Sequence, residues 1–530
     1  MRVVTLVIAM VLPPTLQAQY FGQNRVQYST LNFDVIRTPH FEAHFPRGGD
    51  VAALDAVRMA ERTYGRLSRT LNYQYVARQP LILFGSHSQF QQNNVVPIAE
   101  GTGGVTDAVR QRVLLPFTGS YAELEHVLAH ELVHQFQYDI FARGQPGALD
   151  ALIAINPPLW FMEGMAEYLS LDGPVPNTDM WLKDALLHGG LPTVHELTTD
   201  PTIFPYRYGH DLFRFIESRW GSGAVADVMH AVATYGVGPG LVRALGVGED
   251  ELSIGWSESV HARFPHLQDL VPQGTASLDH RATGARWHLS PALSPDGSKV
   301  VYLSEGNSLS IDLWVANIDA TERRRLVRGA FSAEFESLRF ISSGASWSPD
   351  GVNVAMAVKH GGRDDLVIVN TQSGAVVRRL PIPLDAVMNP TWSPDGSQIA
   401  FTGLMDGWSD LYSIGVSGGV PRRLTADRHA DYHPSWSPDG RSIAFATDRT
   451  DQTNEENLDF GSLAVAVLDL TSGDVTLLPE MTDTNIDPEW SPTGDAIAFV
   501  SSRTGTANVF LYDVAKGTSR PITSVATGVS

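Results

Sequence analysis

The spacing of hydrophobic residues changes about halfway along the chain. Between Tyr20 and about Leu270, short apolar runs bounded by Gly, Pro and Ser alternate with longer stretches in which apolar residues recur every three or four positions. The short runs predict strands at 80–86 and 112–117, and the longer stretches predict helices at 120–142, 160–170 and 209–235. This mixture predicts an α+β domain over residues 20–270.

The second half of the chain, after a linker at residues 271–282, contains a repeated segment. Its five copies are "LSPDGSKVVYLS" at 293, "WSPDGVNVAMAV" at 347, "WSPDGSQIAFTG" at 392, "WSPDGRSIAFAT" at 436 and "WSPTGDAIAFVS" at 490, and their prolines lie 54, 45, 44 and 54 residues apart. Proline presets a turn in each copy, and glycine takes a left-handed position before an alternating apolar strand. This spacing fits one four-stranded blade per copy and predicts an all-β propeller over 283–530, with Trp347, Trp392, Trp436 and Trp490 in the blade cores.

The repeats resemble those of the TolB-type propeller, which has six blades. Five copies are visible here, and the chain stops at "RPITSVATGVS", where the pattern predicts that another repeat would begin. We therefore expect a truncated product that has lost its sixth blade. The alternative is a propeller that closes with five blades and with help from residues 275–292.

Length and composition narrow the possible functions. A chain of 530 residues exceeds one hydrophobic core, so two or more domains are expected. The net charge of −20, without a concentrated Lys/Arg run, argues against nucleic acid or an anionic membrane surface as the main partner. There is no cysteine, so any metal must be held by His, Asp and Glu.

The first residues have the pattern of a secretory signal. An early Arg precedes an apolar run from Val3 to Leu12, and small or polar residues follow around Ala18. The run is too short to span a bilayer, so we expect a signal peptide at residues 1–18 and no transmembrane segment after its cleavage. The mature protein is expected in the periplasm or outside the cell, with association with the outer membrane as a further option.

The segment "SYAELEHVLAHELVHQF", residues 120–136, carries candidate metal chemistry. Ser120 and Glu123 predict a capping box at the start of a helix. On that helix His130 and His134 share one face and Glu131 lies about 100° to the side, which suits two zinc ligands and a general base. His126 is more plausible as a surface or supporting residue than as a fourth ligand, because catalytic zinc keeps a position for water.

The segment "PPLWFMEGMAEYLS", residues 157–170, resembles the second motif of the gluzincin metallopeptidases, the thermolysin-like and aminopeptidase-like group. Their Trp-x-x-Glu-Gly-x-Ala setting is matched by Trp160, Glu163, Gly164 and Ala166. The resemblance implies Glu163 as the third ligand of Zn2+. It also implies that Glu167, which shares the helical face of Glu163, orients a ligand imidazole.

The chain as a whole resembles exported bacterial proteins that join a peptidase-MA-like gluzincin domain to a TolB-type propeller. This implies a zinc metallopeptidase in which Glu131 is the general base and the propeller recruits a polypeptide substrate or an envelope protein partner. For the oxyanion we choose Tyr208 over Tyr206 and His210 in "PYRYGHDLF". Endopeptidase activity is favoured, since no aminopeptidase-type "GAMEN" stretch precedes the helix. The substrate-binding residues are not identified, although the strand edge at 103–117 could pair with an extended peptide.

Two other functions stay open at this stage. In a non-catalytic envelope scaffold, the propeller would bind partner proteins and the metal domain would only bind peptide. The presence of Glu131 favours catalysis, because a degenerate enzyme often loses its base. A glycan-active propeller has only scattered Asp and Trp in its favour. His429 and His433 of "DRHADYH" are interpreted as surface polar residues rather than as a metal site.

Overall fold

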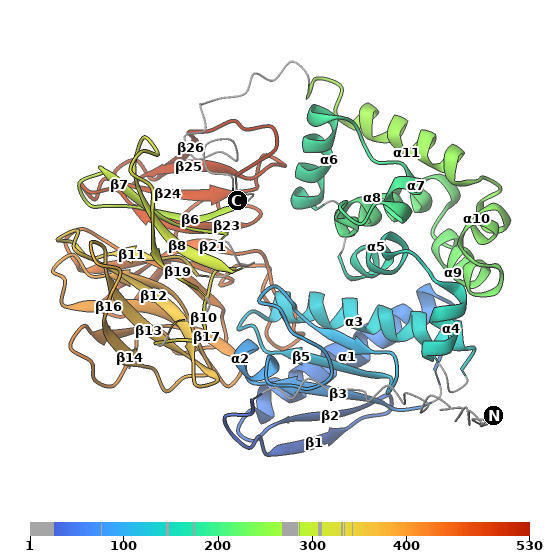
Figure 1. Ribbon diagram of the computed structural model, residues 1–530, viewed down its shortest axis with the longest axis horizontal. Coiled ribbons are helices and arrows are strands. Elements are labelled where there is room, and N and C mark those ends of the chain that lie inside the picture. Colours follow the sequence, from blue (N-terminus) through green and yellow to red (C-terminus); the bar gives the residue numbers. More distant parts are fainter. Residues whose placement is uncertain are drawn as a thin grey trace, which may run out of the picture.

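The computed structural model describes residues 26–529, apart from 76, 145–147, 172, 174, 268–284, 286, 306–309, 330, 331, 333 and 342. The predicted signal peptide at 1–18 and the predicted linker at 271–282 lie outside the described residues. Figure 1 shows an N-terminal sheet, a group of helices and a β-propeller that lies beside both of them.

The N-terminal sheet has five strands in the order β1-β2-β3-β5-β4. The neighbours β2, β3 and β5 run parallel, whereas β1 and β4 pair antiparallel at the two edges. The strands are β1 (Phe33–Arg37), β2 (Phe41–Pro46), β3 (Gln79–Phe84), β4 (Val105–Asp107) and β5 (Arg112–Pro116). The predicted strands at 80–86 and 112–117 are thus confirmed as β3 and β5, and β4 is an edge strand that packs against α3.

Eleven helices accompany this sheet in the described part of the chain. They are α1 (Asp50–Thr70), α2 (His87–Phe90), α3 (Tyr121–Ala142), α4 (Ala148–Ile155), α5 (Leu159–Ser170), α6 (Pro176–His188), α7 (Val194–Thr199), α8 (Pro205–Trp220), α9 (Ala224–Tyr235), α10 (Val237–Leu245) and α11 (Glu249–Arg263). The predictions at 120–142 and 160–170 are confirmed as α3 and α5. The single helix predicted at 209–235 is wrong, because the chain leaves the helix at Gly221, whose φ is +93°.

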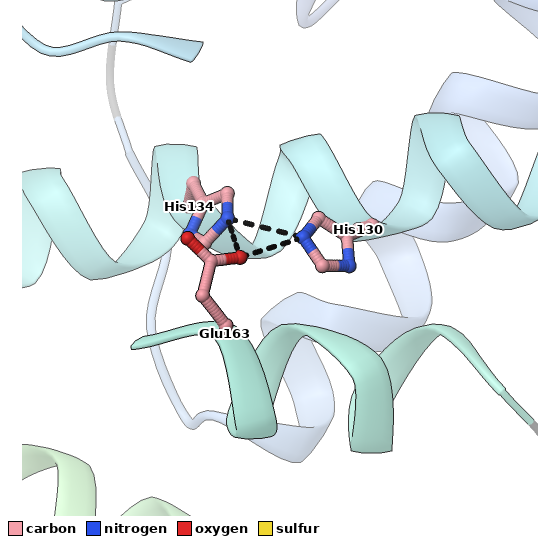
Figure 2. A group of neighbouring side chains, drawn as sticks. All are labelled: His130, His134 and Glu163. Carbon is pink, nitrogen blue, oxygen red and sulfur yellow. Dashed lines mark hydrogen bonds and ion pairs between the residues drawn. The ribbon is translucent and has the colours of Figure 1, made fainter. Parts of the chain in front are cut away.

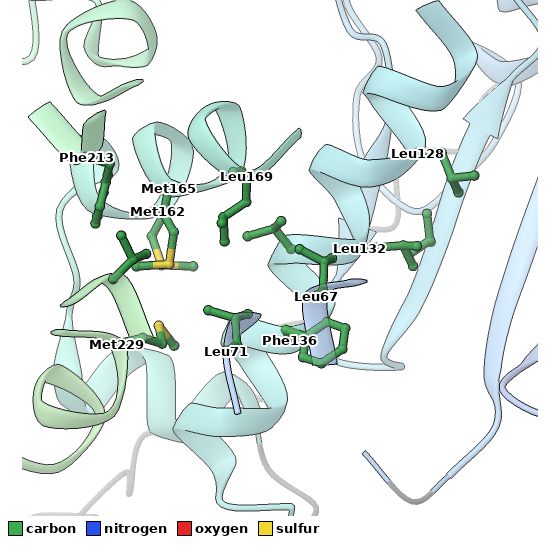
Figure 3. Packing of buried hydrophobic residues seen from close by; sticks show 14 of the residues in the cluster. Leu67, Leu71, Leu128, Leu132, Phe136, Met162, Met165, Leu169, Phe213 and Met229 are labelled. Atoms are coloured by element: carbon green, nitrogen blue, oxygen red, sulfur yellow. The ribbon is translucent and has the colours of Figure 1, made fainter. Parts of the chain in front are cut away.

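The core of this α+β part lies where α3, α5, α8 and α9 meet. Figure 3 shows Phe136 of α3, Met162 and Met165 of α5, Phe213 of α8 and Met229 of α9 packed in one cluster of buried side chains. Unbranched methionines fill irregular gaps between packed helices. This packing holds α3 and α5 side by side.

The propeller consists of five sheets. Four have four consecutive strands, and in the remaining one β10 and β11 both pair with β12. The first blade consists of β6 (His288–Leu293), β7 (Lys299–Glu305), β8 (Ile311–Asn317) and β9 (Arg324–Val327), and the second of β10 (Ser337–Leu338), β11 (Ser346–Trp347), β12 (Asn353–His360), β13 (Arg363–Asn370) and β14 (Val376–Pro381). The third blade consists of β15 (Ala386–Trp392), β16 (Gln398–Met405), β17 (Trp408–Gly415) and β18 (Arg422–Arg423), and the fourth of β19 (Asp431–Trp436), β20 (Ser442–Thr447), β21 (Ala464–Asp469) and β22 (Val475–Leu477). The fifth blade consists of β23 (Asn485–Trp490), β24 (Ala496–Ser501), β25 (Asn508–Asp513) and β26 (Thr518–Pro521).

The repeat motif forms the turn that precedes β7, β12, β16, β20 and β24, as predicted. Its glycines all have a positive φ, between +69° and +75°, at Gly297, Gly351, Gly396, Gly440 and Gly494. Trp347 and Trp392 are buried, and Trp436 and Trp490 are partly buried against the blade cores. The repeats therefore mark blade architecture, with the tryptophans as packing residues.

A buried ion-pair cluster joins the propeller to the α+β part. Arg339 contacts Glu100 of the α+β part and Asp364 of the propeller, with an N–O distance of 2.7 Å in each case. The hydroxyl of Ser88 in α2 donates a hydrogen bond to Asp364 over 2.7 Å. Arg339 is only 6% exposed, so this cluster is sealed from water.

A second contact joins the propeller to the start of α3. The hydroxyl of Tyr432 donates to the backbone carbonyl of Thr118 over 2.9 Å, and the Tyr121 ring packs edge-on against Phe460 at 5.1 Å between centroids. Leu458, on the propeller loop that follows β20, is buried in the hydrophobic cluster of the α+β part. The propeller therefore supports the helix that carries the candidate metal ligands.

Replacing Arg339 by Leu is expected to lower the free energy of unfolding by about 3–5 kcal/mol, because two buried carboxylates lose their cation. Urea denaturation followed by tryptophan fluorescence measures this change. The control is Arg363→Leu, because the Arg363 side chain is 55% exposed and lies 3.7 Å from Asp365. It should cost under about 1 kcal/mol. Equal losses in the two variants would contradict the structural role of Arg339.

Candidate metal centre

Helix α3 begins at the predicted cap. The Ser120 hydroxyl accepts a hydrogen bond from the backbone N–H of Glu123 over 3.2 Å. In a capping box the carboxylate of Glu123 would accept a hydrogen bond from the backbone N–H of Ser120. Here it interacts with the hydroxyl of Thr118 instead. The cap fixes the start of the helix, and His130 and His134 then follow on the face that points toward α5.

Three candidate ligand atoms converge between α3 and α5. The Nε2 atoms of His130 and His134 lie 3.1 and 3.2 Å from Oε2 of Glu163, and 3.2 Å from each other. Figure 2 shows these side chains pointing at one another. Tetrahedral ligands that bind zinc at about 2.0–2.1 Å are spaced by about 3.3 Å. The triangle of atoms therefore has the size that one such ion requires.

The hydrogen bonds of the His130 and His134 imidazoles show that the Nε2 lone pairs of both rings point toward Glu163. Nδ1 of His134 lies 2.8 Å from Oε1 of Gln137, and Nδ1 of His130 lies 3.2 Å from Oε1 of Glu167. Amide and carboxylate oxygens accept, so each Nδ1 is the donor and each Nε2 carries a lone pair in the neutral ring. Two imidazole lone pairs and a carboxylate oxygen repel one another unless a cation or a proton lies between them.

The pKa shifts express the same repulsion in the metal-free protein. Burial disfavours the charged form of His130, but hydrogen bonds to Glu163 and Glu167 raise its pKa to about 10. Burial would raise the pKa of Glu163, and the opposing effect of His134 and His130 lowers it well below its ordinary value. The group thus holds a proton where it could hold a metal ion, and both depend on negative charge at Glu163.

Glu167 supports the site from the next turn of α5. Burial disfavours its charged form, but His130 and Arg207 together lower its pKa to about 2. Its other carboxylate oxygen, Oε2, accepts a hydrogen bond from Nη1 of Arg207 over 2.8 Å. His126 lies 3.8 Å from Glu167 and outside the group formed by the two histidines and Glu163. The positions of Glu167 and His126 agree with supporting roles.

Close packing of α5 on α8 brings an additional tyrosine to the site. A Cβ added to Gly164 would lie 2.4 Å from the Cα of Gly209, so only glycine permits this approach. One turn before Gly209, the ring of Tyr206 is stacked on His130 with 6.1 Å between centroids. Burial and the negative charge of Glu163, which is also its hydrogen-bond partner, raise the pKa of Tyr206. Tyr206 is therefore a neutral hydroxyl donor beside the candidate ligands.

The oxyanion residue chosen from sequence lies elsewhere. Tyr208 is two residues after Tyr206 on α8 and faces Trp181 and Trp256, at 6.1 and 6.5 Å between centroids. His210 is buried, with Nδ1 3.0 Å from the Thr178 hydroxyl. Tyr208 therefore lies away from the candidate ligands and Tyr206 lies beside them, because a step of two residues turns a helical side chain through about 200°.

Glu131 lies beside the three ligand atoms and contacts the sheet. The hydroxyl of Thr106 on edge strand β4 lies 2.6 Å from Oε2 of Glu131. The Glu131 side chain is buried, and its carboxylate takes no part in the His130, His134 and Glu163 group. A carboxylate that flanks a metal centre without binding to it can serve as a general base.

Three residues of this arrangement escaped sequence reasoning: Thr106, Gln137 and Arg207. Gln137 could have been found, because it is three residues from His134 and shares its helical face. Thr106 and Arg207 reach the site across tertiary contacts that have no sequence spacing. Tyr206 was considered, but nothing in the sequence fixes the rotation of α8.

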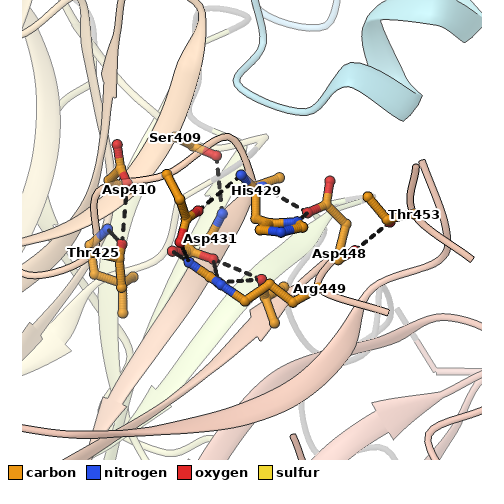
Figure 4. A network of polar contacts seen from close by, with 12 residues as sticks. Ser409, Asp410, Thr425, His429, Asp431, Asp448, Arg449 and Thr453 are labelled. Atoms are coloured by element: carbon orange, nitrogen blue, oxygen red, sulfur yellow. Dashed lines mark hydrogen bonds and ion pairs between the residues drawn. The ribbon is translucent and has the colours of Figure 1, made fainter. Parts of the chain in front are cut away.

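A second acidic group, Asp410, Asp427 and Asp431, lies in the propeller. Arginines already neutralise it: Arg423 binds Asp410, with Nε 3.0 Å from Oδ2, and Arg449 binds both Asp427 and Asp431. Figure 4 shows Asp410, Asp431 and Arg449 of this network and, beside them, His429 next to Asp448. His429 was predicted to be a surface residue, but its side chain is only 20% exposed. The arginine and aspartate network supports the packing of the blades.

Comparison with known proteins concerns the propeller. Residues 280–456 match the TolB beta propeller domain family, PD40. Among solved structures, TolB from Acinetobacter baumannii is 21% identical with a TM-score of 0.36, over 44% of this chain and 53% of that one. A putative TolB from Agrobacterium tumefaciens is 23% identical with a TM-score of 0.37, and the match covers 45% of this chain and 80% of that one. A puromycin-hydrolyzing peptidase from Mycobacterium tuberculosis is 16% identical with a TM-score of 0.35, and the match covers 47% of this chain and 39% of that one.

This chain thus matches about half the length of the Acinetobacter TolB. In the part that the structure describes, no helix is long and apolar enough to cross a membrane. The C-terminal half of the chain is a β-propeller of five described blades, in which residues 280–456 match the TolB beta propeller domain family, and it follows an N-terminal α+β region.

Proposed function

We propose that this protein is an exported zinc-dependent metallopeptidase of the gluzincin type that cuts internal bonds of polypeptides. The observation that carries the proposal is the convergence of His130, His134 and Glu163, whose acceptor atoms lie 3.1 to 3.2 Å apart. A non-ligating carboxylate, Glu131, and a neutral tyrosine, Tyr206, flank the same point. Ligands, base and hydroxyl donor together form the set that metal-assisted hydrolysis of an amide requires.

The residues around the metal would divide the work of hydrolysis. Zinc, when bound, supplies Lewis-acid activation of water and of the scissile carbonyl. Glu131 would take a proton from the attacking water and pass it to the leaving nitrogen. Tyr206 would donate a hydrogen bond to the oxygen that gains negative charge. Glu167 and Gln137 hold the imidazoles so that each Nε2 keeps facing the metal position.

Edge strand β4 supports an extended polypeptide as substrate. Its inner side pairs with β5, and no strand pairs with its other side among the described residues. An extended peptide could add to that free side through backbone hydrogen bonds. Because β4 contacts α3, such a peptide would run past Glu131 and the metal position. This arrangement suits an endopeptidase.

The second candidate function is a binding protein of the cell envelope. The match of residues 280–456 to the TolB beta propeller domain favours it, since the propeller could bind a protein partner whether or not the metal centre is active. In the peptidase proposal, the propeller would recruit polypeptide substrate or hold the enzyme on an envelope partner. Catalysis by the full chain distinguishes the two functions.

Glu131→Gln should abolish most peptidase activity and leave metal binding intact. Loss of the general base is expected to lower kcat by about 100- to 10,000-fold. Cleavage of casein by the full chain, with metal content measured on the same samples, tests this. The control Glu163→Gln should lose both metal and activity. Zinc in the wild type without any cleavage would favour the binding protein.

Zinc binding near pH 7 should release about one proton. In the metal-free protein the pKa of His130 is raised to about 10, so the folded state holds a proton that zinc must displace. Apparent zinc affinity should therefore rise about tenfold per pH unit between pH 6 and 8. Calorimetry in buffers of different ionisation enthalpy counts the protons. Affinity that is independent of pH would contradict this assignment.

Tyr206→Phe and Tyr208→Phe form a matched pair on α8. Removing the Tyr206 hydroxyl should lower kcat by about 100- to 1,000-fold without loss of zinc, because an oxyanion donor is lost. Removing the Tyr208 hydroxyl should change kcat less than about threefold, because its ring lies against Trp181 and Trp256. Steady-state kinetics decides, and the opposite ranking would restore the choice made from sequence.

A further inference from the structure

We propose that Thr106 is a positioning residue that holds the carboxylate of Glu131 in its working orientation, through a hydrogen bond from edge strand β4. The inference rests on the proposed peptidase function and goes beyond it, because it assigns a role to a residue outside the two zinc motifs. Two independent features of the structure carry it: a short hydrogen bond and a glycine against which the carboxylate packs.

The hydrogen bond is directed to one oxygen of Glu131. Oγ1 of Thr106 lies 2.6 Å from Oε2 of Glu131 and 2.9 Å from the backbone carbonyl oxygen of the same residue. A hydroxyl has one proton, and a charged acceptor takes the shorter and stronger bond. Thr106 therefore donates to Oε2, and Oε1 is the oxygen left to exchange a proton with water.

Gly104 confines the carboxylate from the same strand region. A Cβ at position 104 would lie 2.7 Å from Cγ and 2.9 Å from Oε1 of Glu131. It would also lie 3.0 Å from Cδ2 of Leu115, so it could not be accommodated by a small shift to that side. The Glu131 side chain thus packs directly on backbone, and its buried position leaves it little freedom to rotate.

The position of Thr106 connects the base with the proposed substrate edge. Thr106 pairs with Val113 of β5 in the register of the sheet. A peptide that adds to the outer side of β4 would meet the strand that holds the base. Peptide and base would then share one rigid support, which is the geometry that precise proton transfer needs.

The test compares Thr106→Val, which keeps the shape and removes the hydroxyl, with Thr106→Ser, which keeps the hydroxyl. In the full zinc-loaded chain, Thr106→Val should lower kcat about 10- to 100-fold with unchanged zinc content, and KM should change less than threefold. Thr106→Ser should recover most of the activity. Thr234→Val on α9, whose hydroxyl bonds to the backbone carbonyl of His230, is the matched control and should retain full activity.

Crystal structures of the zinc-loaded wild type and Thr106→Val provide a readout that does not need activity. The wild type should show the Glu131 carboxylate on Thr106, and the variant should show it rotated away. An unchanged carboxylate in Thr106→Val, or equal kcat in Val and Ser variants, would overturn the proposal. If the zinc-loaded wild type cleaves nothing, the peptidase function fails, and the carboxylate orientation alone decides whether Thr106 positions Glu131.

Discussion

The candidate metal centre is defined by the close approach of three acceptor atoms, which repel one another unless a cation or a proton lies between them. His130 and His134 each use Nδ1 as a donor, to Glu167 and Gln137, so their Nε2 lone pairs face Oε2 of Glu163 at 3.1 to 3.2 Å. Such a group is stable only around a positive charge. The neighbouring features serve this arrangement. His130 and Arg207 lower the pKa of Glu167, and the Gly164 and Gly209 contact sets the distance between α5 and α8.

The propeller also supports the helix that carries the candidate ligands. Tyr432 and Phe460 hold the start of α3, and Leu458 completes the core of the α+β part. The buried Arg339 cluster fixes a second contact between the two parts. The helix that carries both histidines is therefore supported by the sheet on one side and by the propeller at its N-terminus. The two parts form one structural unit, so the full chain is the appropriate sample for assays.

Local patterns predicted some of the regular elements. The strands β3 and β5, the helices α3 and α5 and the glycine turns of the repeats depend on periodicity and backbone preference, which sequence displays directly. The single helix predicted at 209–235 failed at Gly221, where a positive φ outweighed a continuous apolar pattern. Composition and periodicity alone could not supply Glu163, which came from a resemblance to a known motif.

Apart from Gln137, which lies three residues after His134 on the same helix, the parts of the site that sequence missed depend on tertiary contacts. Tyr206 was passed over for Tyr208 because the rotation of α8 is set by its contact with α5. Thr106 approaches Glu131 from the short edge strand β4, and Arg207 on α8 reaches Glu167 on the neighbouring helix α5. Spacing along the chain carries no information about such contacts. The candidate ligands and the residues that surround them are thus predictable from sequence to different degrees.

Diffraction at the zinc absorption edge tests the central claim most directly. Crystals of the full chain grown with one equivalent of zinc are predicted to show a single anomalous peak about 2.0–2.2 Å from Nε2 of His130, Nε2 of His134 and a carboxylate oxygen of Glu163. A peak at another position, or ordered side chains at this site without a peak, would contradict the account.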